Sequence, residues 1–201
     1  MSRFRVLLLS CIVFCSRSIC LDDFSSLCID ASAPDVNGAI HFNATCMPSP
    51  GSTNLTWCGF GFSNNSSTTM FPSSIFVLQL GAVNNVWLED RNAQSGYVLP
   101  PCFSSQASAF IGGSRGADGA LHGSWTRQAI PTAAQQSAGY VDLVGTVTAI
   151  AASSSDGARA EAACSNYMEP HVFVVTGTPF SFPQAATQRS KAAGAPKTRS
   201  L

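Results

Sequence analysis

Apolar residues along most of the chain either alternate with polar residues or form short blocks, and turn residues separate these stretches. Alternation places successive side chains on opposite faces of a strand, whereas almost no stretch repeats at the helical period. The pattern predicts strands over 38–46, 54–62, 73–80, 86–91, 107–112, 119–127, 143–152 and 171–176. The chain is therefore predicted to be all-β.

The turns between these strands agree with an antiparallel arrangement. Asn84-Asn85 and Asp118-Gly119 tolerate positive φ and stand where tight hairpin turns are needed. Short strands at this spacing predict a two-sheet antiparallel β-sandwich of immunoglobulin-like architecture. We expect the sandwich to span 38–184, with 21–37 as a separate N-terminal segment. The small, polar and basic residues of 185–201 predict a disordered tail, because they cannot bury enough apolar surface to fold.

The first twenty residues have the layout of a signal peptide. Two arginines precede the apolar run 6–14, and small or polar residues follow it. This layout predicts a signal peptide over 1–20, with cleavage between Ser18 and Leu21. The apolar run is much shorter than the ~20 residues of a spanning helix. We therefore expect no membrane span in the mature chain, and a secreted, extracellular protein or one in the lumen of the secretory pathway.

Composition narrows the possible partners and the number of domains. The chain of 201 residues is long enough for one domain of ordinary size. Charged residues make up 11% of it, and their formal charges cancel. A nucleic-acid partner is not expected, because no basic surface is indicated.

The cysteines predict disulfides. No CxxC pair occurs, so zinc knuckles, thioredoxin-like redox sites and covalent haem attachment lack their motif. In a secreted chain, structural disulfides are the expected use of cysteine. Six cysteines pair evenly if cleavage spares Cys20, whereas the five that otherwise remain leave one unpaired. Spacing leaves the connectivity open, although a Cys28–Cys46 pair is preferred. The disulfide candidates after the signal are Cys28, Cys46, Cys58, Cys102 and Cys164.

Acceptor triplets for N-glycosylation, Asn-x-Ser/Thr, are clustered in the first third of the chain. Such triplets are used only in the secretory pathway and only on exposed segments. The cluster predicts a glycoprotein and agrees with the signal peptide. The acceptors are Asn43, Asn54, Asn64 and Asn65.

Several motifs resemble those of the DOMON domain. The chain has W-x-G-F-G-F-S at 57–63, a short loop that ends in Met70, an apolar strand at 75–80 and L-E-D-R-N-A at 88–93. This order is similar to that of DOMON β-sandwiches, such as the N-terminal region of dopamine β-monooxygenase and the cytochrome domain of cellobiose dehydrogenase. The resemblance continues through G-S-W-T-R at 123–127 and ends near His171, so that it covers 38–182. The chain departs from the family pattern at 71–73 and at 176–177.

The resemblance implies a module that binds haem or sugar, rather than an enzyme. Met70 and His171 would be the axial ligands of a non-covalent b-type haem. Neutral thioether and imidazole ligands saturate the iron and favour electron transfer, here to or from a separate redox partner protein. The candidate apolar walls of the haem site are Phe60, Phe62, Trp87 and Phe173.

Other interpretations of these residues stay open. Met70 is equally suited to fill a gap under a loop, and His171 to lie at the edge of the core. His41 or His122 is a possible substitute for His171. Phe60 and Phe62, like Trp57, also fit a sandwich core.

Two other functions are possible. A haem-free glycan-binding module would use Trp87, Tyr97 or Trp125 as a stacking platform. A serine hydrolase is a more distant alternative, because 112–116 fit G-x-S-x-G around Ser114, and Asp142 and His171 follow. However, a nucleophile elbow joins a strand to a helix, whereas another strand is expected after 116.

Overall fold

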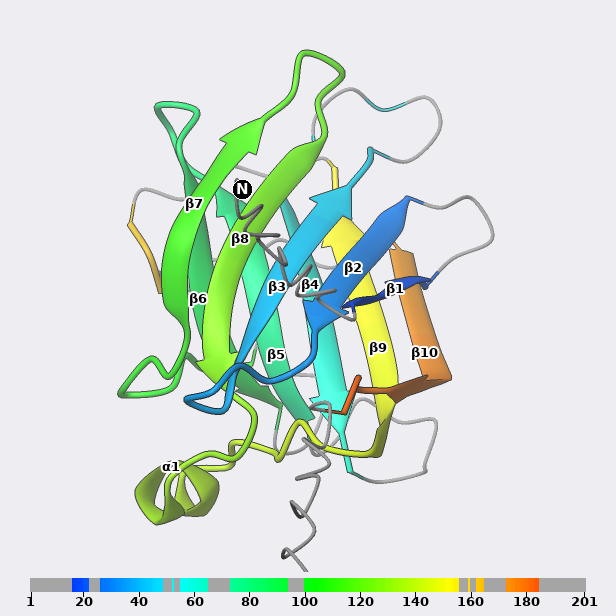
Figure 1. Cartoon of the computed structure of the whole chain (residues 1–201). Helices are drawn as coiled ribbons and strands as arrows, with labels where there is room; N and C mark the ends of the chain where they lie inside the picture. Colours follow the sequence, from blue (N-terminus) through cyan, green and yellow to red (C-terminus); the bar gives the residue numbers. More distant parts are fainter. Residues whose placement is uncertain are drawn as a thin grey trace, which may run out of the picture.

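The computed structural model describes residues 16–21, 26–48, 52, 55–64, 73–93, 100–155, 159, 162–164 and 173–184. Two five-stranded antiparallel sheets pack against each other, which confirms the predicted β-sandwich (Figure 1). The first sheet contains, in spatial order, β1 (Ser16–Cys20), β2 (Leu27–Ser32), β3 (Ala39–Cys46), β8 (Leu121–Gln128) and β7 (Ala109–Arg115). The second contains β10 (Phe173–Ser181), β9 (Thr146–Ser154), β4 (Trp57–Ser63), β5 (Ser73–Leu80) and β6 (Val86–Ala93). One short helix, α1 (Ala133–Ser137), follows β8.

The interior between the sheets is rich in aromatic side chains. Phe42 of β3 lies near its centre and stacks on Trp125 of β8, with ring centroids 5.3 Å apart. From the second sheet, Phe62 and Phe76 contact the Phe42 ring, with ring centroids 6.4 and 5.3 Å from its centroid. Alternation in β3 and β8 turns every second side chain into this interior. The apolar residues at these positions therefore bury their surface between the two sheets.

The sandwich extends beyond the predicted N-terminal boundary at residue 38. β2 pairs with β3, and β1 pairs with β2, so residues 27–32 of the predicted N-terminal segment belong to the sheet. The reason lies in β2 itself, where Leu27, Ile29 and Ala31 are buried and the residues between them are partly exposed. β1 also overlaps the segment predicted as a signal peptide.

Three disulfides form among the described residues, which confirms the predicted structural role of these six cysteines. They join Cys20 to Cys28, Cys46 to Cys58 and Cys102 to Cys164. The preferred Cys28–Cys46 pair is wrong. Thr45 lies opposite Cys28 in the ladder, so neighbouring Cys46 points to the other face of the sheet. Cys46 therefore faces the interior and reaches Cys58 of the second sheet.

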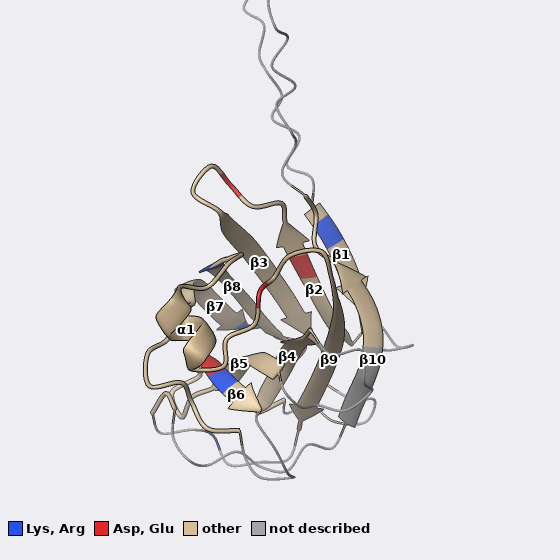
Figure 2. Ribbon diagram, turned by 90° about the horizontal axis from the view of Figure 1, so that it is seen from below, with Lys and Arg blue, Asp and Glu red and all other residues tan. Residues whose placement is uncertain are grey.

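Charged residues are few on the described strands, and three of them, Glu89, Asp90 and Arg91, follow one another on β6 (Figure 2). Within the described ranges, no helix is long and apolar enough to cross a membrane. Hydrogen bonds to a charged side chain of β6 hold a neighbouring loop in place. Asp90 of β6 accepts hydrogen bonds from the backbone N–H groups of Ala107 and Ser108, both at 2.8 Å, and thereby ties the segment after β6 to the sheet edge.

Candidate functional site

The second sheet carries a buried apolar cluster on the face that points away from the sandwich interior. Phe60 and Phe62 of β4 point inward, so Trp57, Gly59 and Gly61 point outward. Trp57 is only 6% exposed, although the first sheet does not cover it. We call this surface the outer face; its buried apolar residues are Trp57, Ile75, Val77 and Ala93, with Ala152 packed against them.

Two glycines leave the middle of the outer face without side chains of its own. A Cβ added at Gly61 would lie 2.5 Å from Cγ1 of Ile150, a residue of the neighbouring strand β9. A Cβ at Gly59 would lie at ordinary contact distance, 3.4 Å, from the side chains of Ile75 and Val77. Side chains of β5 and β9 therefore close over the backbone of β4 at these two positions.

The strand register decides where the flanking connections join the outer face. Ser63, at one end of β4, pairs with Thr148 and is followed by the connection to β5. At the other end, Trp57 pairs with Ser154, and Phe173 pairs with Ser153. The β4–β5 and β9–β10 connections thus join opposite ends of the face. They contain Met70 and His171, respectively, and both residues lie outside the described residues.

A buried ion pair forms the polar border of the outer face on β6. Glu89 lies opposite Val77, and Arg91 lies opposite Ile75. The Arg91 Nη2 atom is 2.7 Å from Oε2 of Glu89, and the Arg91 Nη1–H group donates to the Pro100 carbonyl at 2.8 Å. Both side chains are at most 2% exposed, so the pair and its extra hydrogen bonds offset the cost of removing two charges from water.

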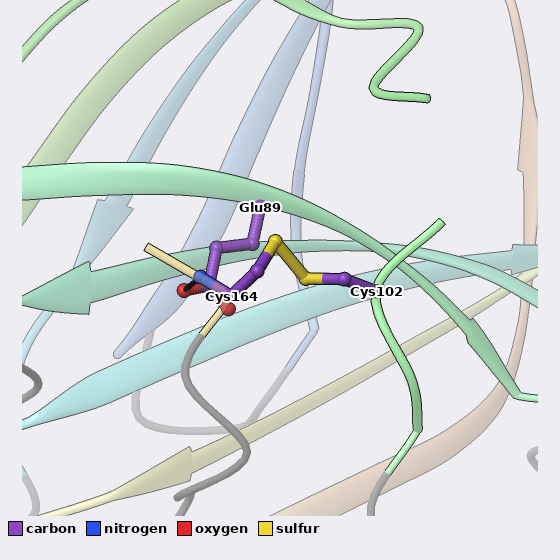
Figure 3. A group of neighbouring side chains, drawn as sticks. All are labelled: Glu89, Cys102 and Cys164. Carbon is purple, nitrogen blue, oxygen red and sulfur yellow. Dashed lines mark hydrogen bonds between the residues drawn. A yellow bond between two sulfur atoms is a disulfide. The ribbon is translucent and has the colours of Figure 1, made fainter. Parts of the chain in front are cut away.

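The Cys102–Cys164 disulfide lies directly beside this ion pair (Figure 3). The backbone N–H of Cys164 donates to Oε1 of Glu89 at 2.6 Å. The two sulfurs and a Glu89 oxygen all lie within 4.8 Å of one another, a spacing that would suit a metal ion. However, a metal prefers thiolate ligands, and these sulfurs are bonded to each other. The group is therefore a cross-link that anchors the segment around Cys164 to β6.

The predicted wall residues are divided between different places. Phe60 and Phe62 are fully buried and face the first sheet, as the core interpretation expected. Trp87 is half-buried on β6, where it pairs with Gln79 at the border of the outer face. Phe173 begins β10, but its side chain lies outside the described ones.

The histidines considered as substitutes for His171 belong to the other sheet. His41 of β3 is exposed on the side of the first sheet that faces away from the interior. His122 of β8 lies on the same side, with its Nδ1 atom 3.2 Å from Oγ1 of Thr45. The whole thickness of the sandwich separates both residues from the outer face, so neither can act there.

The glycan-binding alternative loses one of its predicted platforms. Trp125 is fully buried and stacks on Phe42, so the prediction that it stacks on a sugar is wrong. The cause is its position on β8, which turns it inward. Tyr97 lies outside the described residues, and Trp87 is half-buried.

The serine hydrolase alternative is excluded because Ser114 and Asp142 lie too far apart. Ser114 pairs with His122 near one end of β8, whereas the residue after Asp142 donates its backbone N–H to Ala129, beyond the other end. At ~3.3 Å per residue these positions are roughly 20 Å apart. Ser114 also lies within strand β7 rather than at a strand-to-helix turn. Ser114 and Asp142 cannot therefore belong to one triad.

Two of the predicted glycosylation acceptors lie among the described residues, and both are exposed. Asn43 is on β3 and points to the solvent side of the first sheet, and Asn64 directly follows β4. Asn54 and Asn65 lie outside the described residues. The exposure of Asn43 and Asn64 meets the requirement for modification.

No protein-family model matches the chain, and a search of curated proteins gives no match either. The DOMON resemblance therefore rests on the residues that carry it.

The outer face could have been predicted from a sequence pattern that was not used above. In G-F-G-F at 59–62, the glycines and phenylalanines occupy opposite faces of the strand, so neighbouring strands must supply the side chains that cover the glycine face.

Proposed function

We propose that the protein is a secreted, DOMON-like electron-transfer domain that holds a non-covalent b-type haem on the outer face of its second sheet. The observation that carries this proposal is the buried apolar surface around Gly59 and Gly61, with flanking connections at its opposite ends. The side chains of this face are apolar, and apolar walls supply most of the affinity for a ligand that is not covalently attached.

The residues of the chain fit the proposed group in their chemistry. Met70 and His171 would hold the iron from the connections at the two ends, through thioether and imidazole donors. Trp57, Ile75 and Val77 would exclude water from the face. When bound, a haem supplies an iron centre that gains and loses one electron, and two protein ligands favour electron transfer over oxygen chemistry.

The polar border supports the same function. Glu89 and Arg91 neutralise each other, so they place no net charge at the edge of the apolar surface. The backbone contact from Cys164 to Glu89 also connects this border to a disulfide. A rigid and neutral border lowers the reorganisation that accompanies a change in the charge of a bound group.

Secretion is part of the proposal. Disulfides persist in an oxidising compartment, and two of them, Cys46–Cys58 and Cys102–Cys164, lie wholly beyond the predicted signal peptide. Two acceptor asparagines are also exposed. These features support passage through the secretory pathway, as does the signal-peptide layout at 1–20. The redox partner would then be a separate extracellular or lumenal protein.

Titration of the purified full chain with haemin tests the ligand assignment. Met70→Ala should still bind haem but change its absorption spectrum from six- to five-coordinate, and His171→Ala should lose most of the affinity. His41→Ala and His122→Ala are the matched controls, because both remove an imidazole from the opposite side of the sandwich. Far-ultraviolet circular dichroism verifies that each variant keeps its strands. An identical spectrum in all four variants would contradict the assignment.

A further inference from the structure

A groove of about 470 Å³ crosses the solvent side of the first sheet, opposite to the outer face. It lies over β3, β8 and β7, and the proposed haem site does not use it. Most of its lining side chains are small or polar. The residues that matter here are Asn43, Thr45, Ile111, Gly112, His122 and Ser124.

The register places an open floor in the same row as Asn43. Asn43 lies opposite Ser124, and Ser124 lies opposite Gly112, so the three form a row across three strands. With neighbouring strands ~4.8 Å apart, this row spans roughly 10 Å. A Cβ added at Gly112 would meet nothing within 4 Å. The floor of the groove is therefore open at Gly112, two strands across from Asn43.

One apolar side chain stands at the rim of the groove. The ladder between β7 and β8 shifts its register between Phe110 and Gly112, and the extra residue is Ile111. Its side chain is 62% exposed, so it is accessible to an occupant of the groove. Polar groups lie across the floor, where the Thr45 hydroxyl contacts His122 Nδ1 at 3.2 Å.

We propose that this groove holds the first sugar of an N-linked glycan attached to Asn43. Asn43-Ala44-Thr45 is an acceptor triplet whose asparagine lines the groove, so the attachment point itself selects the occupant. N-acetylglucosamine combines an apolar ring face with hydroxyl and acetamide groups. Ile111 offers an apolar contact to the ring face, and Ser124 and His122 offer hydrogen-bonding partners.

The covalent step needs a lipid-diphosphate-linked oligosaccharide as donor. The amide nitrogen of Asn43 forms a bond to the anomeric carbon of the first sugar and gives up one proton to a base of the transferase. The bond from that carbon to the diphosphate oxygen breaks, and the lipid diphosphate leaves with the electron pair. β3 is synthesised before β7 and β8, so Asn43 is accessible before its neighbours form the groove.

This inference rests on entry into the secretory pathway, as in the proposed function. The test uses the full chain secreted from a glycosylating host, with occupancy of each asparagine measured by peptide mass spectrometry. The native protein is then treated with a peptide N-glycosidase, which cleaves between asparagine and the first sugar. The glycan at Asn43 should be released several-fold faster from Ile111→Ser than from the unmutated chain, whereas release at Asn64 should not change.

Val83→Ser is the matched control, because it also replaces an exposed aliphatic residue, 82% exposed, but on the turn after β5. It should leave release at Asn43 unchanged. An unmodified Asn43 in a chain modified at Asn64 would overturn the inference alone, as would equal release rates in Ile111→Ser and the unmutated chain. Absence of glycan from every acceptor would overturn both this inference and the proposed secretion, while haem binding would remain a separate measurement.

Discussion

Ile150 of β9 packs directly over Gly61 of β4, so closely that a Cβ at position 61 would lie 2.5 Å from the Ile150 Cγ1 atom. Ile150 cannot easily turn away, since branching at Cβ restricts its χ1 rotamer. The contact therefore fixes the pairing of β4 with β9, in which Gly61 lies opposite Ile150. It also explains why the aromatic strand at 57–63 contains glycine at this position.

Gly61→Ala is expected to lower the free energy of unfolding by about 1–3 kcal/mol, because the added methyl group overpacks the contact with Ile150. Chemical denaturation measures this change. Gly59→Ala is the matched control on the same strand and face, where the new Cβ lies 3.4 Å from its nearest neighbours. Equal destabilisation by both substitutions would contradict this packing account.

Much of the fold was predictable from the sequence. In a half-buried strand apolar and polar residues alternate, and the apolar ones show which face of the strand is buried. The strand predicted at 73–80 coincides with β5, and that predicted at 38–46 differs from β3 by one residue. The outer face was harder to predict. All residues of β4 and β5 are buried, so their periodicity does not distinguish the interior from the opposite face.

The disulfide pairing was not predictable either, because spacing along the chain does not say which way a side chain points. Cys28 and Cys46 lie on neighbouring strands but on opposite faces, and this depends on a register that only the folded sheet defines. For Met70 and His171 the sequence predicts the chemistry of the ligands, and the described strands show only which ends of the face their segments join.

The Cys46–Cys58 disulfide joins the two sheets, and both residues are fully buried. Replacing both with alanine is expected to lower the free energy of unfolding by about 2–4 kcal/mol, because the unfolded chain regains entropy. The double replacement of Cys20 and Cys28 should cost less. It affects the exposed edge strand β1, which can fray without unfolding the sandwich. Urea denaturation of both double variants checks this order, and a reversed order would refute it.

Tyr140 is expected to make stability fall at alkaline pH. Burial, and secondly the Asp90 carboxylate 3.1 Å from its hydroxyl, raise the pKa of Tyr140 above its ordinary value. Above pH ~10 the unfolded chain loses this proton while the folded protein keeps it, so unfolding becomes more favourable by up to ~1.4 kcal/mol per pH unit. The contribution is complete below pH ~10 and is lost as pH rises through the folded-state pKa.

Tyr140→Phe isolates this effect. At neutral pH the variant should be about 1–3 kcal/mol less stable, because Asp90 loses a hydrogen-bond donor. Above pH ~10 the stability difference from the unmutated protein should shrink. Burial lowers the pKa of Arg127 to about 10, but Arg127 is present in both proteins and its contribution cancels to first order. A stability difference that stays constant from pH 7 to 11 would rule out the proposed titration.

The visible absorption spectrum of the secreted full chain, recorded as purified and after addition of haemin, tests the central claim most directly. The account predicts one haem per chain with a low-spin, six-coordinate spectrum in both oxidation states, because Met70 and His171 would both ligate the iron under the proposed assignment. A high-spin spectrum would contradict the ligand pair. A colourless protein whose spectrum shows no bound haem after haemin is added would contradict the haem-binding function itself.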